Sequence, residues 1–136
     1  MESINIKGYH GTYYIPSVNF DAQTGFCELG GESYLEDSAG FFKPLLLWLR
    51  EFLDTQSKKL TFNFRLEYYN TSSSKYIVDI FLILKKYQKL GKEIEVNWFY
   101  NNKSEDYNED IEEVEDFMLE TGLKINLKPI YPEKDE

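Results

Sequence analysis

The sequence has very few of the residues that build metal sites, disulfides and common catalytic centres. Of its 136 residues, one is cysteine and one is histidine. A single cysteine, Cys27, excludes an internal disulfide and a cysteine-based zinc site, and its place in an expected strand favours a small buried hydrophobe over a nucleophile. His10 is expected to be a surface residue. The sequence contains no G-x-G-x-x-G, G-x-x-x-x-G-K-[ST] or H-E-x-x-H motif, so no conventional active site or cofactor is indicated.

Basic residues and long apolar runs are also scarce. The 15 Lys and Arg residues face 24 Asp and Glu residues, giving a net charge of −9. Nucleic acid is therefore not an expected partner, because binding to its phosphates depends on Lys and Arg displacing counterions. Apolar runs such as residues 45–49 are far shorter than the roughly 20 residues needed to span a bilayer. The first residues lack the basic and apolar regions of a signal peptide, so we expect a cytoplasmic protein without membrane insertion.

Apolar and aromatic residues are present in the amounts typical of a folded chain. Hydrophobic residues make up 42% of the sequence and aromatic residues 17%. A chain of this length is long enough to bury a core but short for two domains. We therefore expect one domain over residues 1–130, followed by a polar tail at residues 131–136.

The spacing of apolar residues predicts an alternation of strands and helices. Residues 12–20 and 26–31 are expected to form a hairpin, with Pro16 at an edge or bulge. A helix should follow, with Ser38 as its N-cap, and Pro44 is tolerable there if it falls within the first turn. Beyond it come strand 60–68, a helix ending before Gly91, strand 93–100, helix 105–120 and strand 123–127.

The predicted order ββαβαβαβ indicates the α/β class, with a mostly parallel sheet and a hairpin at its start. Strand 60–68 should be central, with Leu60, Phe62, Phe64, Leu66 and Tyr68 on one side of it. The helix at 105–120 carries nine acidic residues but no calcium-binding loop, so we expect a solvated outer face. A docking surface for a basic partner is the alternative for this helix.

Four hydroxyl residues stand between the central strand and the next helix, in the stretch Glu67-Tyr-Tyr-Asn-Thr-Ser-Ser-Ser-Lys75. In α/β sheets, functional loops gather at the carboxyl ends of strands, where this stretch is expected to lie. One of Asn70, Thr71 and Ser72 would be enough to cap the helix. The remaining hydroxyls are explained either by solvation or by a regulatory phosphate, which a helix N-terminus would receive well.

Three segments resemble the SiaC-type family of bacterial regulatory phosphoproteins. They are Arg65-Leu-Glu-Tyr-Tyr-Asn-Thr-Ser-Ser73, Gly31-Glu-Ser-Tyr34 with Glu36 and Ser38, and Val96-Asn-Trp-Phe-Tyr100. The resemblance runs from about residue 30 to residue 129. Leu35 and Asp37 stand where proline and asparagine are common in the family.

The resemblance implies a STAS-like fold, similar to anti-sigma-factor antagonists, and a protein that is not an enzyme. It implies partner switching, in which a protein kinase phosphorylates Thr71 and a PP2C-type phosphatase removes the phosphate. The unmodified form would bind and activate a diguanylate cyclase, which places the chain in cyclic-di-GMP and biofilm signalling. Residues expected to line the site or contact partners are Tyr68, Asn70, Ser72, Ser73, Gly31, Glu32, Ser33 and Tyr34.

A second hypothesis belongs to a different class. The strand end around Tyr68, Asn70 and Thr71 would bind a small molecule, or another protein, without any covalent switch. The mass of the protein from its native cells distinguishes the two hypotheses, because only the switch requires a phosphate.

Overall fold

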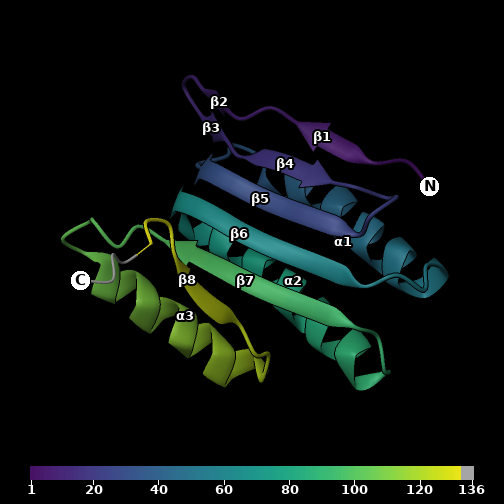
Figure 1. Ribbon diagram of the computed structural model, residues 1–136. Helices are drawn as coiled ribbons and strands as arrows, with labels where there is room; N and C mark the ends of the chain where they lie inside the picture. The colour runs from purple at the N-terminus through teal and green to yellow at the C-terminus, as the bar shows by residue number, and fades with distance from the viewer. Residues whose placement is uncertain (133–136) are drawn as a thin grey trace.

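Six strands form the main sheet of the computed structural model, which describes residues 1–132 (Figure 1). Their order across the sheet is β1-β4-β5-β6-β7-β8, and neighbours from β5 to β8 run parallel. The bounds are β1 Ile4–Ile6, β4 Ser17–Phe20, β5 Phe26–Ser33, β6 Leu60–Tyr69, β7 Ile94–Tyr100 and β8 Asn126–Pro129. Strand β6 lies inside the sheet, which confirms the prediction of a central strand. The last four residues of the expected tail lie outside the described residues.

Three helices connect the parallel strands within the described part of the chain. They are α1 (Ser38–Thr55), α2 (Thr71–Lys89) and α3 (Tyr107–Thr121). Helices α1 and α2 cover one face of the sheet, and α3 lies near β7 and β8 (Figure 1). None of these helices is both long and apolar enough to cross a bilayer. The α/β class with a mostly parallel sheet is confirmed.

The amino-terminal region contains two strands that the sequence did not predict, β1 (Ile4–Ile6) and β2 (Tyr9–His10). The expected strand at residues 12–20 is divided at Pro16, which cannot donate a ladder hydrogen bond, into β3 (Tyr14–Ile15) and β4. Strand β1 pairs with β4 in antiparallel fashion at the sheet edge. Strand β2 (Tyr9–His10) pairs only with β3, as a short ribbon apart from the main sheet. The expected order ββαβαβαβ is therefore incomplete at its start.

The start of α1 differs from the prediction in two ways. Asp37, not Ser38, is the N-cap, and its Oδ1 accepts a hydrogen bond from the backbone N–H of Gly40 at 3.0 Å. Asparagine fills the same capping role, so this departure from the family pattern keeps the helix start intact. Pro44 is the seventh helical residue and lies beyond the first turn. The helix therefore lacks one hydrogen bond to the carbonyl of Gly40.

Aromatic side chains fill the core between the sheet and the helices. Phe64 of β6 is fully buried, with its ring centroid 4.4 Å from Phe62, 5.0 Å from Phe81 and 5.2 Å from Trp98. Phe117 of α3 packs 5.4 Å from Phe81, centroid to centroid. This cluster joins β6, β7, α2 and α3, and so fixes the position from which β6 leads into α2.

The alternation of β6 changes near its carboxyl end, which corrects the placement of Tyr68. Gly31 of β5 pairs with Leu66, but the next residue of β5 pairs with Tyr68, so Glu67 is an extra residue in β6. Such a bulge shifts the side-chain pattern by one. Tyr68 is consequently 48% exposed, while Tyr69 is half-buried and lies edge-on to a tryptophan of the core.

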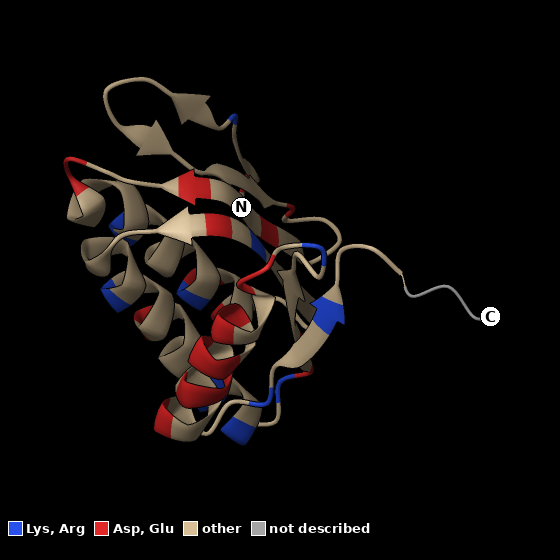
Figure 2. Ribbon diagram, turned by 90° about the vertical axis from the view of Figure 1, so that its left-hand side faces the viewer, with Lys and Arg blue, Asp and Glu red and all other residues tan. Residues whose placement is uncertain are grey.

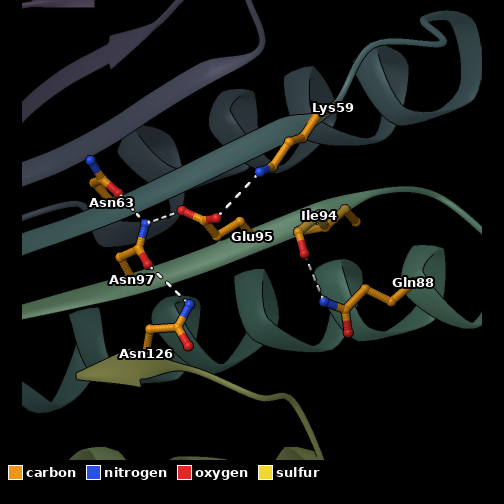
Figure 3. A network of polar contacts seen from close by, with 7 residues as sticks. All are labelled: Lys59, Asn63, Gln88, Ile94, Glu95, Asn97 and Asn126. Carbon is orange, nitrogen blue, oxygen red and sulfur yellow. Dashed lines mark hydrogen bonds and ion pairs between the residues drawn. The ribbon is translucent and has the colours of Figure 1, made fainter. Parts of the chain in front are cut away.

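The sheet face away from α1 and α2 carries a ladder of asparagines (Figure 3). The amide of Asn97 donates to Asn63 Oδ1 at 2.9 Å, and the amide of Asn126 donates to Asn97 Oδ1 at 3.1 Å. Asn97 also donates to Glu95, whose other oxygen pairs with Lys59 at 3.2 Å. These two contacts lower the pKa of Glu95, with the hydrogen bond from Asn97 the larger cause. The ladder ties β6, β7 and β8 together side by side.

Cys27 is fully buried in β5, as the sequence predicted. Burial raises the pKa of its thiol, because a thiolate would lose its hydration there. We expect the native protein to react with a thiol reagent far more slowly than the same protein in denaturant. Absorbance with a disulfide reagent measures both rates. Equal rates in the two conditions would contradict a buried thiol.

Candidate functional site

The candidate site lies where β6 ends at Tyr69 and α2 begins at Thr71. Asn70 is the N-cap of α2, and its Oδ1 accepts a hydrogen bond from the backbone N–H of Ser73 at 3.0 Å. The backbone N–H of Asn70 donates to the carbonyl of Ser33 at 3.0 Å. The junction is therefore tied to the end of β5 as well as to α2. Its place at a strand's carboxyl end agrees with the prediction.

Hydroxyl groups from three segments converge on the side chain of Asn70. Its Oδ1 accepts hydrogen bonds from the hydroxyls of Ser73 at 2.6 Å and Ser72 at 3.1 Å. A serine hydroxyl donates only one proton. Ser73 and Ser72 must therefore act as acceptors in their other hydrogen bonds. The hydroxyl of Ser33 donates to Ser73, and the hydroxyl of Ser38 donates to Ser72, each at 2.7 Å. Two chains of hydrogen bonds thus end on one amide oxygen and hold the starts of α1 and α2 together.

The hydroxyls of Thr71 and Ser74 lie outside the network that engages Ser72 and Ser73, and of these two residues only Thr71 is exposed. Thr71 is the first residue of α2. Within residues 1–132, its hydroxyl takes part in no hydrogen bond, and the backbone N–H groups of Thr71 and Ser72 donate none. Free N–H groups at the positive end of a helix dipole favour an anionic group. A phosphate on Thr71 would therefore be added beside ready donors, without disturbing the network on Asn70.

The residues predicted as a second patch divide between structural and exposed positions. Gly31 has a φ of 80°, a conformation that glycine adopts easily, and it precedes the register shift between β5 and β6. Ser33 is fully buried in the hydroxyl network, and Glu32 is half-buried beside it. Tyr34 is 44% exposed and exchanges two backbone hydrogen bonds with Tyr14 of the ribbon. Only part of this patch is available to a partner.

The sequence did not indicate that the β2–β3 ribbon would border this patch. His10 stacks on Tyr14 at 4.5 Å between ring centroids, and its Nε2 lies 3.7 Å from Glu32 Oε1. Tyr13 stacks on Tyr34 at 5.9 Å. The signal was the presence of three tyrosines within residues 9–14, which is unusual for a loop. His10 is exposed, as expected.

A pocket of about 530 Å³ opens at the carboxyl ends of β6 and β7. It is lined by Arg65, Leu66, Glu67, Tyr69, Trp98, Phe99, Tyr100, Asn101, Ser104, Asp110, Ile130 and Tyr131. None of the three residues around which a small-molecule site was predicted, Tyr68, Asn70 and Thr71, lines it. A ligand in this pocket would therefore leave the Thr71 hydroxyl accessible.

The wall of this pocket nearest α3 is acidic. Partial desolvation at the pocket wall raises the pKa of Asp110, and neighbouring carboxylates, with Glu113 the largest contributor, add to the rise. Burial and then Glu113 also raise the pKa of Tyr69. The carboxylates predicted to form the solvated face of α3 are all exposed: Glu109, Asp110, Glu112, Glu113 and Asp116.

Replacing Asn70 with alanine should destabilise the junction without removing Thr71. The change removes the N-cap and leaves the buried hydroxyl of Ser73 without its acceptor, so we expect the free energy of unfolding to fall by about 1–3 kcal/mol. Urea denaturation followed by circular dichroism measures the loss. Asn70→Asp, which retains an acceptor oxygen, is the matched control and should lose less. Equal losses would contradict the role assigned to the Asn70 oxygen.

Together these features define a small α/β domain that presents an exposed threonine at a helix start, beside a network of hydrogen-bonded serines. A family model described as SiaC family regulatory phosphoprotein matches residues 9–130. The chain belongs to the SiaC family.

Individual relatives agree with this assignment. An uncharacterized protein of Pseudomonas aeruginosa strain UCBPP-PA14 is 32% identical over 105 residues, which cover 77% of this chain and 81% of that protein. The crystal structure of apo-SiaC from Pseudomonas aeruginosa matches with a TM-score of 0.80 at 27% identity, over 94% of this chain and 99% of that one.

A structure of a complex is also similar. It is the crystal structure of the diguanylate cyclase SiaD with its activator SiaC from Pseudomonas aeruginosa. Its matching chain has a TM-score of 0.79 and 27% identity, over 91% of this chain and 99% of that one. The fold expected from the family resemblance is therefore confirmed.

Proposed function

We propose that this chain is a phosphorylation-switched regulator that activates a diguanylate cyclase and has no catalytic activity of its own. The observation that carries the proposal is the exposed Thr71 at the start of α2, beside a network that engages Ser72 and Ser73. The similar SiaC structure in complex with SiaD supports a cyclase as the partner. The unmodified chain binds the cyclase, and phosphate on Thr71 ends the interaction.

The proposal includes two enzymes that set the state of Thr71: a protein kinase and a PP2C-type phosphatase. The exposed residues Tyr34 and Tyr68, with Glu32 of β5 beside the ribbon, form the surface that partners recognise. Asn70 and its bonded serines maintain the shape of the junction. We assign the chain to the cytoplasm, where a kinase and the nucleotide substrate of a cyclase are available.

Purified components test this proposal directly. The unmodified chain is added to each diguanylate cyclase encoded in its own organism, and the synthesis of cyclic di-GMP is measured. We expect a saturable increase for at least one cyclase. The intact mass of the chain from its native cells should show a fraction heavier by one phosphate. Absence of activation for every cyclase would contradict the proposal.

Binding of a small molecule is the second candidate function, and the pocket at the ends of β6 and β7 favours it. Native mass spectrometry of the chain from its own cells would then show a non-covalent ligand. Tyr100→Ala, which removes one wall of the pocket, should reduce the bound fraction. This result is independent of the phosphate on Thr71.

A further inference from the structure

Two adjoining hollows lie between α1 and α2. Their volumes are about 420 and 320 Å³, and they share Leu46, Arg50 and Asp79. The first extends toward the helix starts, to Lys43 and Tyr76, and the second extends toward their ends. We call the two hollows together the α1–α2 groove. The hydrogen bond that joins the two helix starts sets one end of the groove.

The groove has an apolar floor with exposed leucines beside it. Leu47 of α1 is 64% exposed, and Leu82 of α2 is 48% exposed. Leu46 and Ile83 lie between them and are almost completely buried. The two exposed leucines, one on each helix, form an apolar strip that a partner could cover.

The charge of the groove is opposite to that of the chain. Its lining contains four cations, Lys43, Arg50, Lys75 and Lys86, and one anion, Asp79. The chain as a whole has a net charge of −9. Figure 2 shows the contrast, with basic residues on the helices that cover the sheet, whereas the charged residues of α3 are acidic. An acidic partner is therefore attracted to the groove and repelled by α3.

We propose that the α1–α2 groove binds an acidic amphipathic helix of a protein partner. Residues 75–86 of α2 extend roughly 16 Å, about three helical turns. The ridges of a third helix fit between two helices of this kind, with its apolar side on the leucines and its carboxylates toward Lys43, Arg50 and Lys86. The inference rests on the proposed function, because it assigns the helix to the cyclase.

The groove also explains how a phosphate on Thr71 would affect binding. Thr71 and Lys75 are four positions apart on α2, and both are exposed. Side chains with this spacing lie on the same side of a helix. A phosphothreonine would pair with Lys75 and place negative charge at the amino-terminal end of the groove. An acidic helix would then lose its interaction with Lys75 and be repelled by the phosphate.

A defined peptide tests the groove without the cyclase. The probe is a synthetic amphipathic helix with leucines on one side and glutamates on the other, and a scrambled peptide of equal composition is its control. A trifluoromethyl tag on Leu82→Cys reports binding by fluorine NMR, since Cys27 is buried. The same tag on Leu119→Cys, on acidic α3, is the matched control. We expect only the helical peptide to shift the signal, and only from Leu82→Cys.

Charge-reversing variants then test the role of the cations. Arg50→Glu combined with Lys86→Glu should weaken peptide binding by about tenfold or more. Lys7→Glu combined with Lys124→Glu changes the net charge equally at exposed positions outside the groove and should alter binding less than about twofold. Equal weakening by both pairs, or no peptide signal at Leu82→Cys, would overturn the inference.

The cyclase identified in the activation assay provides a separate test of the groove. Cross-linking from Leu82→Cys, and not from Leu119→Cys, would support the groove as its binding site. Activation with cross-linking only from Leu119→Cys would overturn the inference and leave the proposed function intact. A signal from the tagged chain alone that changes with its concentration would identify a second copy as the occupant and would also overturn it. If no cyclase is activated, the proposed function fails, while the peptide result still decides the groove.

Discussion

Phosphorylation of Thr71 should weaken binding to the cyclase by about a hundredfold or more while the domain stays folded. The added dianion meets the free N–H groups and positive dipole at the start of α2, a favourable interaction of typically 0.3–1 kcal/mol at exposed sites. The folded domain therefore tolerates it. At the interface, a desolvated or repelled phosphate costs several kcal/mol. Titration of the cyclase with each purified form, followed by calorimetry, measures the difference.

Variants at Thr71 test whether negative charge at this position is what weakens binding. Thr71→Ala should remain folded and activate the cyclase even in the presence of the kinase. Thr71→Asp should bind weakly, because an aspartate has less charge and fewer acceptors than a phosphate. Ser74→Ala, at a half-buried hydroxyl of the same helix, is the matched control and should still be switched by the kinase.

Two results would contradict Thr71 as the switch. One is phosphate found only on Ser72, Ser73 or Ser74, and the other is phosphorylated protein that binds as tightly as the unmodified form. Ser73 is fully buried and Ser72 donates to Asn70, so a phosphate on either would break the network first. The geometry therefore favours Thr71, which is exposed and outside the network, over Ser74, which is half-buried.

The strongest periodic patterns predicted the fold well. The alternation through Phe62 and Phe64 located β6, and the helical spacing from Ile77 to Tyr87 located α2, because both elements bury one continuous apolar side. Strands β1 and β2 were missed because they are only two or three residues long and bury little. Their order depends on pairing with distant residues, which a local pattern does not contain.

The candidate site was predictable in place but not in detail. A surplus of hydroxyls beside a helix start indicated the junction at Asn70, and the family resemblance indicated Thr71. The bonds that join Ser33 to Ser73 and Ser38 to Ser72 connect residues 34 or more positions apart, so only the folded chain shows them. The exposure of Tyr68 depends on the bulge in β6, which arises from pairing with β5 and leaves no sign in the alternation.

Replacing Phe64 with alanine should reduce the free energy of unfolding by about 3–5 kcal/mol. Phe64 is fully buried and contacts three other rings, so the smaller side chain leaves a cavity that β6, with a neighbour on each side, cannot close by moving. A loss of this size is a large part of the 5–15 kcal/mol typical of a domain. Urea denaturation of both proteins measures it.

The control for this change is Leu119→Ala, at a leucine that is 83% exposed on α3. That variant should lie within about 0.5 kcal/mol of the parent, because little apolar surface leaves water there on folding. The folded fraction of Phe64→Ala should still activate the cyclase, since Thr71 and the network on Asn70 are unchanged. A loss below about 1 kcal/mol for Phe64→Ala would show that the aromatic cluster can repack. Such repacking would mean that the cluster does not hold β6, and with it the start of α2, in one position.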